Sequence, residues 1–454
     1  MNELRELRSA AREIFDEALR ASDARRAMLR AVEFDGTTLR VGDAHFELRV
    51  NAPKVYSIAL GKAAAAMASA LDERLGKTLM GGVLSAPRSD FKLSERWRVY
   101  EGGHPLPNAE SMEAARSAFE LLREADDAGV LVVFLVSGGG SAMLELPRDA
   151  RLTLEELREA NRVLVSCGAP IDEVNAVRRA LSAVKGGGLA SLAPRAAQAT
   201  LVVSDVAPGR AYDVASGPTL EAPPDSPHVT EIIARYGLAS KLPFPVLRVL
   251  KETGAHSPAQ TPPEAQRTFH VLLDNASACE AAVQAASARG FVVEFARDIV
   301  EQHVEEGAAE LVSRLLTLYA REWAAGGRGV CLISGGEFSC PVRGGGTGGR
   351  NSETALRIAL EFEKVLVERA ARVGLAPEHV AALCAGTDGI DGNSPAAGAL
   401  ADKTTNTRAR ARGLDARKFL EESDAYTLFN LLGDAIHTGP TGTNVRDIRI
   451  LLAC

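Results

Sequence analysis

Short runs of β-branched and apolar residues alternate along this chain with stretches rich in alanine and leucine. The run "KVYSIAL" (54–60) is followed by the helical stretch 61–76, and "GVLVVFLV" (129–136) is a strand apolar enough to be buried on both faces. Strands that alternate with helices in this way are typical of an α/β fold with a parallel sheet. This alternation limits the possible folds more than any other feature of the sequence, and we expect an α/β protein.

The same alternation continues to the end of the chain. A helix is predicted at 153–168, where Thr153 and Glu156 form a capping box, and a second at 170–188. Another helix is expected to open at Asn275. The remaining predicted strands are 199–205, 269–274, 291–296, 329–337, 380–389 and 447–453.

The length of 454 residues predicts two domains or more. Prolines accumulate between about 222 and 265, in "APPDSP", "KLPFPVL" and "SPAQTPPEA". We place the boundary in this zone, which gives an N-terminal domain of 1–235 and a C-terminal domain of 236–454. The first 20 residues have the apolar spacing of an amphipathic helix, not of a signal peptide.

Charge and composition argue against several kinds of partner. The net charge is −7 and no block of lysine and arginine stands out, which argues against nucleic-acid binding. The longest apolar stretch, "VLVVFLV", has seven residues and is too short to span a bilayer. Six scattered cysteines fit reduced thiols better than disulfides or a zinc site. We therefore expect a cytoplasmic protein with no nucleic-acid or membrane partner.

One stretch, "VRGGGTGGRN" (342–351), places five glycines between two arginines. Such density suggests that backbone N–H groups approach a ligand, and Arg343 and Arg350 suggest that the ligand is an anion. The stretch fits neither the P-loop pattern nor a dinucleotide fingerprint. A flexible surface loop is an equally weighted alternative.

Five loops share one pattern, in which an apolar strand ends in Gly, Ser, Thr or Asp. In a parallel sheet the carboxyl ends of the strands meet at one edge, where ligands bind. Glycine turns and helix N-termini solvate phosphate oxygens through backbone N–H groups, so the pattern predicts a polyphosphate site. The five loops are 136–144, 202–209, 333–340, 385–393 and 437–447.

Four acidic residues in these loops could hold Mg²⁺, which prefers a few carboxylates together with phosphate oxygens and water. They are Asp205, Glu337, Asp388 and Asp391. For each of them a turn or a helix cap is an alternative of equal weight.

Two cations and two histidines are further candidates. Lys62 begins an alanine-rich helix, where an anionic ligand would compensate its charge; a surface lysine is the alternative. Arg350 suits the charge of a transferring phosphoryl group. His104 and His437 lie in turns and are expected to be structural rather than general bases.

Taken together, the motifs resemble the class II glycerate 2-kinase family, in order from about Gly61 onward. The resemblance implies an N-terminal Rossmann-like α/β/α domain with a parallel sheet and a C-terminal α/β domain with the MOFRL region. It also implies ATP- and Mg²⁺-dependent phosphorylation of D-glycerate to 2-phosphoglycerate in the cleft between the domains. The motifs are "SGGGSAMLELP", "NAVRRALSAVKGGGLA", "SDVAPGRAYDVASGPT", "ISGGEFSCPVRGGGTGGRNSETAL", "AGTDGIDGNSPAAGA" and "TGPTGTNVRDIRILL".

The resemblance assigns roles to Lys62, Arg350, Asp205 and Asn175, and the other roles are assigned from the five loops described above. Lys62 of the G-K motif, Arg350 of the G-G-R-N motif and Asp205 of the S-D-V motif are expected to be catalytic, with Asp205 orienting the acceptor hydroxyl or accepting its proton. The residues expected to bind glycerate are Lys62, Asn175, Arg350 and Ser137, and Asp205 and Asp388 are expected to meet Mg²⁺. The residues expected to cradle ATP are Gly138, Gly139, Gly140, Ser141, Gly335, Gly336, Glu337, Thr441, Gly442, Thr443 and Asn444.

The chain also departs from the family pattern. "RGGGTGGRNSE" stands where a more cationic "RGKGRGGRNQE"-like stretch is common, and Asn393-Ser394-Pro395 stands where an acid and a threonine are common. These changes could alter the binding of the nucleotide or the choice of acceptor.

We consider three hypotheses of function. The first is the kinase, for which replacing Lys62 or Arg350 by alanine should abolish turnover while melting stays near wild type. The second is an NAD(P)H-dependent hydroxypyruvate reductase, a label that relatives have carried, although no G-x-G-x-x-G follows a strand. The third is a non-catalytic nucleotide-binding module. A homodimer is possible.

Overall fold

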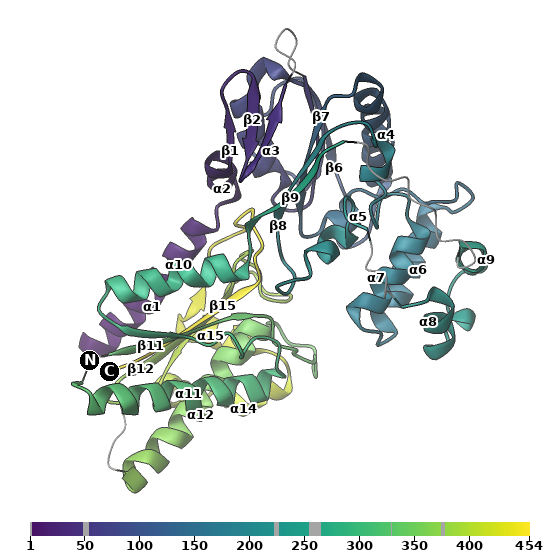
Figure 1. Cartoon of the computed structure of the whole chain (residues 1–454). Coiled ribbons are helices and arrows are strands. Elements are labelled where there is room, and N and C mark those ends of the chain that lie inside the picture. Colours follow the sequence, from purple (N-terminus) through teal and green to yellow (C-terminus); the bar gives the residue numbers. More distant parts are fainter. Residues whose placement is uncertain (1, 49–53, 222–226, 254–264, 328, 374–376) are drawn as a thin grey trace. The chain divides into compact units, whose positions relative to one another are not determined.

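Figure 1 shows the computed structural model of the chain, which describes residues 2–48, 54–221, 227–253, 265–327, 329–373 and 377–454. The chain forms two compact units. The N-terminal unit is Ala24–Leu272, and the C-terminal unit combines Met1–Asp23 with Leu273–Cys454. Each unit has its own sheet and its own core.

The units differ from the predicted domains 1–235 and 236–454 at both ends. Helices α8 (Val229–Arg235) and α9 (Phe244–Thr253) share an apolar core with α7 (Ile171–Leu181) of the N-terminal unit, so the chain leaves this unit only at Leu272. Helix α1 (Asn2–Ala21) packs on the C-terminal unit. The proline-rich zone is therefore not the boundary between compact units.

The N-terminal unit is built on a six-stranded sheet in the order β6-β5-β4-β7-β8-β9. The neighbouring pairs from β6 to β8 are parallel, as the sequence predicted. The strands are β4 (Val55–Leu60), β5 (Leu79–Ala86), β6 (Trp97–Glu101), β7 (Leu131–Ser137), β8 (Gln198–Val203) and β9 (Arg267–Leu273). All seven residues of β7 are buried, which is the signature of a strand covered on both faces.

Helices cover this sheet in an α/β/α arrangement. Helix α4 (Ala109–Ala128) packs over the face that carries Ile58 and Phe134, and α3 (Ala64–Leu75) packs on β4, β5 and β7. The other elements of the unit are α2 (Ala24–Ala31), the small antiparallel sheet β1 (Val32–Phe34), β2 (Thr38–Val41) and β3 (Ala44–Glu47), α5 (Gly140–Met143), α6 (Leu154–Ser166) and the 3₁₀ segment η3 (Ala211–Ser216).

The bounds of helices were predicted unevenly. The helix predicted at 61–76 begins only at Ala64, so Lys62 lies in the turn before α3 and not on the helix itself. The capping box of Thr153 and Glu156 at the start of α6 is confirmed. The helix predicted at 170–188 is wrong in its second half, because α7 ends at Leu181 and Ser182 adopts an extended conformation. Gly186 and Gly187 then take positive φ, which ends helical geometry in this segment.

The C-terminal unit has a six-stranded mixed sheet in the order β10-β11-β15-β12-β13-β14. The strands are β10 (Val292–Phe295), β11 (Val330–Gly336), β12 (Val380–Gly386), β13 (Gly398–Asp402), β14 (Ala435–Ile436) and β15 (Asp447–Ala453). Figure 1 shows α1 and α10 (Asn275–Ala288) on one side of this sheet, and α11 (Val304–Ala324) and α12 (Arg350–Val373) on the other. Short helices complete the unit: α13 (Thr405–Ala411), α14 (Ala416–Glu421) and α15 (Ala425–Leu432).

Strand β15 lies between β11 and β12 and runs antiparallel to both. Gly336 at the end of β11 and Gly386 at the end of β12 are both opposite Asp447 at the start of β15. In a wholly parallel sheet, each loop at this edge would follow a strand. The loop 437–447 instead precedes its strand, β15. Three of the five predicted loops nevertheless lie at this edge.

None of the described helices is both long and apolar enough to cross a bilayer.

Candidate active site

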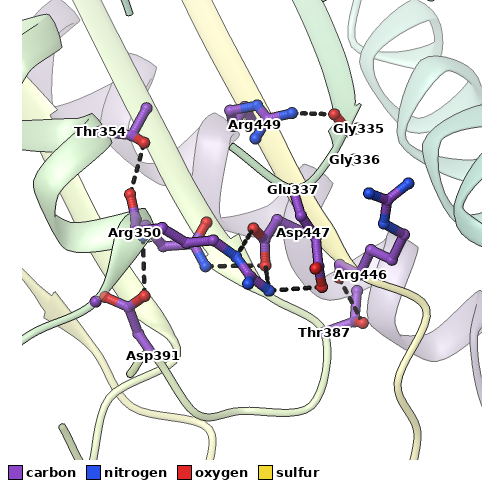
Figure 2. A network of polar contacts seen from close by, with 12 residues as sticks. Gly335, Gly336, Glu337, Arg350, Thr354, Thr387, Asp391, Arg446, Asp447 and Arg449 are labelled. Carbon is purple, nitrogen blue, oxygen red and sulfur yellow. Dashed lines mark hydrogen bonds and ion pairs between the residues drawn. The ribbon is translucent and has the colours of Figure 1, made fainter. Parts of the chain in front are cut away.

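Arg350, the first residue of α12, is held by two carboxylates at the edge of the C-terminal sheet (Figure 2). Its Nη2 donates to Glu337 Oε1 at 2.6 Å, and its Nε donates to Asp447 Oδ2 at 2.5 Å. The Asp447 side chain is only 2% exposed. Burial lowers the pKa of Arg350, but the attraction of Asp447 and Glu337 outweighs it and the net direction is upward. Arg350 is thus a fixed cation whose charge these acids already balance in part.

Beside Arg350, Gly335 and Gly336 at the end of β11 are held by two side chains from other elements. Asn275 Oδ1 accepts the Gly336 N–H at 2.8 Å, and a Cβ atom on Gly335 would lie 1.9 Å from that oxygen. The buried Arg449 lies 3.7 Å from the ring centre of Phe338 and donates to the Gly335 carbonyl. We did not select Asn275 or Arg449 from the sequence. The available signal for Arg449 was a charged residue inside the apolar strand "DIRILLA".

Asp391 caps the start of α12. It accepts the N–H groups of Asn351 at 2.9 Å and Ser352 at 2.8 Å, one with each carboxylate oxygen. These first-turn amides are therefore used inside the protein, as the helix-cap alternative for this acid expected. The Asn351 side chain does not cap α12 but donates to Asp447 Oδ1 at 3.0 Å. Asp391 was predicted as a possible metal ligand, and its oxygens point instead at the helix.

The buried Asp391 predicts a pH dependence of stability. Burial raises the pKa of Asp391 from 3.8 to about 6, so the folded protein binds this proton more tightly than the unfolded chain. This stabilisation is fully present below the pKa of the unfolded chain and is lost as the pH rises through the pKa of the folded protein. We expect the unfolding free energy of wild type, minus that of Asp391→Asn, to fall by on the order of 3 kcal/mol from about pH 4 to about pH 7. Urea titrations of both proteins across this range measure it, and a difference that is flat or rises would contradict the assignment.

The glycine-rich loop 342–351 is packed against its own unit. The N–H groups of Gly346, Thr347 and Gly348 donate to the Glu422 carbonyl at 2.9 Å, Asp424 Oδ1 at 2.8 Å and Asn393 Oδ1 at 2.8 Å. These amides are consequently not directed at an anion, and the expected cradle at this loop is wrong. The glycines let the loop approach its neighbours closely, which is a packing role that neither sequence alternative included.

Two neighbouring glycines test this packing role. A Cβ atom on Gly346 would lie 2.4 Å from Asp424 Cβ, whereas nothing lies within 4 Å of one on Gly345. We expect Gly346→Ala to lose about 1–3 kcal/mol of stability through overpacking and Gly345→Ala to stay within about 0.5 kcal/mol of wild type. Chemical denaturation of the two variants gives the comparison. Unchanged stability in both, with a raised KM for ATP, would restore the anion-cradle interpretation.

The loop that enters β15 lies beside the end of β12. Thr441 Oγ1 donates to the Thr387 carbonyl at 2.6 Å, and its N–H donates to the Asp388 carbonyl at 3.3 Å. Gly442 is exposed and Asn444 Oδ1 accepts the Arg446 N–H at 3.1 Å. Thr443 is buried, and its hydroxyl has no hydrogen-bond partner in the described part of the chain. The predicted residues 441–444, Asp388 and the two glycines that end β11 thus belong to one sheet edge.

In the N-terminal unit, Lys62 and the "SGGGS" turn lie side by side. The Lys62 N–H donates to the Gly138 carbonyl at 2.9 Å, and Ser137 Oγ accepts the Ala63 N–H at 3.0 Å. Gly61 is required here because its φ is +110° and a Cβ atom would lie 2.4 Å from the Ser137 carbonyl oxygen. The Lys62 side chain is half-buried.

Asp205 and His104 contact the same turn. A Cβ atom on Gly138 would lie 2.0 Å from Asp205 Oδ2, and one on Gly139 would lie 3.1 Å from His104 Cδ2. The turn leads into α5, whose first amides, Gly140 and Ser141, have no partner within the helix. The turn therefore combines N–H groups that have no partner within the helix with a lysine, a carboxylate and an exposed imidazole.

Asn175 is joined to this turn through two serines. Its Oδ1 accepts from Ser216 Oγ at 3.3 Å, and Ser216 Oγ lies 3.0 Å from Ser141 Oγ. Its Nδ2 donates to the buried Asp213 at 3.4 Å, which fixes the orientation of the amide. Ala215 and Ser216 both take positive φ, at 51° and 62°, a strained conformation that clusters at functional sites. Asp213 and Ser216 were missed, although both lie in the quoted "AYDVASGPT" motif.

Neither Asp205 nor Asp388 belongs to a metal-binding group in the described residues. The one group there of three or more closely spaced potential ligands is Glu3, Glu378 and His379. His437 is exposed and lies edge-on to Tyr426 with ring centres 6.1 Å apart.

The comparisons with known proteins identify the family. Residues 10–251 match the family described as a domain of unknown function, DUF4147, and residues 330–447 match the MOFRL family. Curated relatives named glycerate kinase or glycerate 2-kinase match 98% of the chain at 33% to 36% identity. The chain therefore belongs to the glycerate kinase family of two-domain α/β kinases that carry the MOFRL region, as its motifs indicated.

Two curated relatives illustrate the similarity. Human "Glycerate kinase" is 36% identical over 98% of this chain and 93% of its own length. "Glycerate 2-kinase" of Pyrococcus horikoshii is 33% identical over 98% of this chain and 97% of its own length. A solved structure of glycerate kinase from Thermotoga maritima superposes with a TM-score of 0.80 at 30% identity, covering 99% of this chain and 100% of that one.

Proposed function

We propose that the chain transfers the γ-phosphoryl group of ATP to the 2-hydroxyl of D-glycerate and releases 2-phosphoglycerate. The observation that carries this proposal is the meeting of Lys62, Asp205 and the Gly138–Ser141 turn in the N-terminal unit. Curated relatives that bear the names glycerate 2-kinase and D-glycerate 2-kinase, at 33% identity, support the choice of acceptor.

Phosphoryl transfer needs positioning and charge stabilisation more than covalent chemistry. The N–H groups of Gly140 and Ser141 have no partner within α5 and would solvate phosphate oxygens, while the Lys62 ammonium would balance the charge on the transferring group. Asp205, whose carboxylate lies against Gly138, would orient the acceptor hydroxyl and accept its proton. In the C-terminal unit, Gly335 and Gly336 at the end of β11 and residues 441–444 lie at one sheet edge and would bind an anionic group there.

Arg350 is proposed to bind negative charge while Asp447 holds its guanidinium in place. One Nη2 contact, to the partly exposed Glu337, is available for exchange with an anionic group, whereas the contact to Asp447 is buried. Substrate or phosphate would therefore compete with Glu337 and not with Asp447.

Mg²⁺ fits the donor set of the site. Asp205 and Asp388 are half-buried carboxylates beside predicted phosphate-binding turns, and neither lies in a preformed cage of three protein ligands in the described residues. This suits an ion that arrives with ATP and keeps several waters. When bound, Mg²⁺ would neutralise charge on the nucleotide phosphates.

Product identification tests the proposal. The protein is incubated with ATP, Mg²⁺ and D-glycerate, and phosphorus NMR is used to distinguish 2-phosphoglycerate from 3-phosphoglycerate. A 2-phospho product supports the proposal. A 3-phospho product would contradict the regiochemistry, and unchanged ATP with every small hydroxy acid would favour a non-catalytic nucleotide-binding module.

The reductase remains the competing candidate because one relative, from Agrobacterium vitis and 35% identical, is named "Putative hydroxypyruvate reductase". An assay for NAD(P)H oxidation with hydroxypyruvate separates the two functions. We expect no oxidation above the blank.

A further inference from the structure

A buried lysine holds the predicted phosphate-binding turn from inside the N-terminal unit. The Lys185 side chain is 2% exposed, and its Nζ donates to the Ser141 carbonyl at 2.8 Å. The same Nζ forms an ion pair with Glu145. Lys185 lies in the "VKGGG" part of a motif from which only Asn175 has been given a role.

The Ser141 carbonyl lacks its normal helical partner. In a longer helix it would accept the N–H of Glu145, four residues on, but α5 ends at Met143 and the Glu145 N–H donates to the Ser111 carbonyl at 3.2 Å. A single helical turn is not stable by itself, so external contacts decide its position. Lys185 takes the place of the missing donor.

Glu145 makes the anchor rigid. One carboxylate oxygen pairs with Lys185, and the other accepts from Ser182 Oγ at 2.5 Å and from the Leu146 N–H at 2.9 Å. The Glu145 side chain is 6% exposed. The Lys185 ammonium therefore has a fixed position, and through Ser141 so does the start of α5.

Burying this ion pair has a free-energy cost, because both charged groups lose their hydration. Burial lowers the pKa of Lys185, and Glu145 opposes that effect. Apolar residues of similar volume often replace a buried ion pair without loss of stability, so general stability alone does not explain the pair. The contact with Ser141 supplies a further reason.

We propose that Lys185 is a positioning residue that fixes the Gly138–Ser141 turn in the conformation that binds the nucleotide phosphates. This inference rests on the proposed function, because it takes the turn to be part of the ATP site. In this role Lys185 would contact neither the substrate nor the nucleotide.

The test uses a double variant, Lys185→Met with Glu145→Gln, in the full-length chain. Lys185→Met alone would leave a buried carboxylate without its partner and could fail to fold. The double variant removes the ion pair and keeps an acceptor for Ser182. Lys403→Met is the matched control, since Lys403 Nζ also donates to a backbone carbonyl, that of Glu378, in the C-terminal unit.

Melting temperature, the Kd for ATP by calorimetry, and kcat and KM for ATP and D-glycerate are measured for each protein. We expect the double variant to fold, to bind ATP at least tenfold more weakly, and to raise the KM for ATP while the KM for glycerate changes less than threefold. A general loss of folded protein would instead lower apparent kcat and leave both KM values unchanged. Wild-type affinity for ATP in the folded double variant, or a weakened affinity in the Lys403→Met control, would overturn the inference.

The two proposals can fail separately. If wild type binds ATP but does not phosphorylate glycerate, the proposed function fails and the Kd comparison still decides the role of Lys185. If wild type does not bind ATP, the inference falls with the ATP site.

Discussion

Replacing Arg350 with alanine is expected to abolish turnover and also to lower the melting temperature by about 5–15 °C. The guanidinium is the charged partner of Asp447, whose side chain is only 2% exposed. Breaking a buried pair from one side costs about 3–5 kcal/mol, and here Asp447 would lose its charged hydrogen-bond partner and keep the neutral amide of Asn351. This replaces the expectation from the sequence alone that melting would stay near wild type.

Arg350→Lys separates the two effects. A lysine keeps the charge near Asp447 but cannot contact Asp447 and Glu337 with a planar fork, so melting should recover more than turnover does. Scanning calorimetry and a coupled ADP-release assay measure both quantities. An alanine variant that melts with wild type would show that Asp447 does not depend on Arg350, and near-normal turnover would remove Arg350 from the mechanism.

Replacing Lys62 with alanine is expected to lower kcat by at least about a thousandfold with little change in melting. The hydrogen bond from Lys62 to Gly138 is made by the backbone N–H, which alanine keeps, and the side chain is only half-buried. The loss should therefore be electrostatic and specific to the transferring group.

Two variants accompany that measurement. Lys62→Arg retains the charge and should recover a fraction of the activity, while Lys77→Ala removes an exposed lysine of the same unit and should behave as wild type. Steady-state kinetics with melting curves for all three proteins check the prediction. Turnover within a few fold of wild type in Lys62→Ala would exclude the lysine from the reaction.

The predictions from sequence succeeded where local patterns decide the structure. Strand β15 was predicted at 447–453, and the "SGGGS" turn beside Lys62 follows a strand as expected. The period of apolar residues and the glycines that end strands report directly on these elements. The family was indicated because several such motifs occur in one order.

The failures concern contacts between distant segments. Nothing local in "NVRDIRILL" shows that β15 runs antiparallel between β11 and β12, which places Asp447 opposite Gly336 and Gly386. The glycine loop was misread for the same reason, since its neighbours Glu422 and Asp424 are about 75 residues away in sequence. Glycine density indicates close approach but not the group that is approached.

The site residues that sequence reasoning missed are mostly supports. Asn275, Asp213, Ser216, Lys185 and Arg449 each hold a turn or a ligand-facing side chain through a contact that spans many residues. Such roles depend on three-dimensional proximity, which a single sequence does not display.

The position of β15 has a consequence for how a nascent chain acquires its structure. Helix α1 is synthesised before α10, β12 and β15, yet it packs on all three. Its apolar face, which includes the fully buried Ile14 and Phe15, cannot be covered completely until more than 400 further residues have been translated. A chain that stalled before Asp447 would lack β15, the strand that pairs with both β11 and β12. Part of the apolar face of α1 would then stay exposed, and such a chain would be prone to bind chaperones or to aggregate.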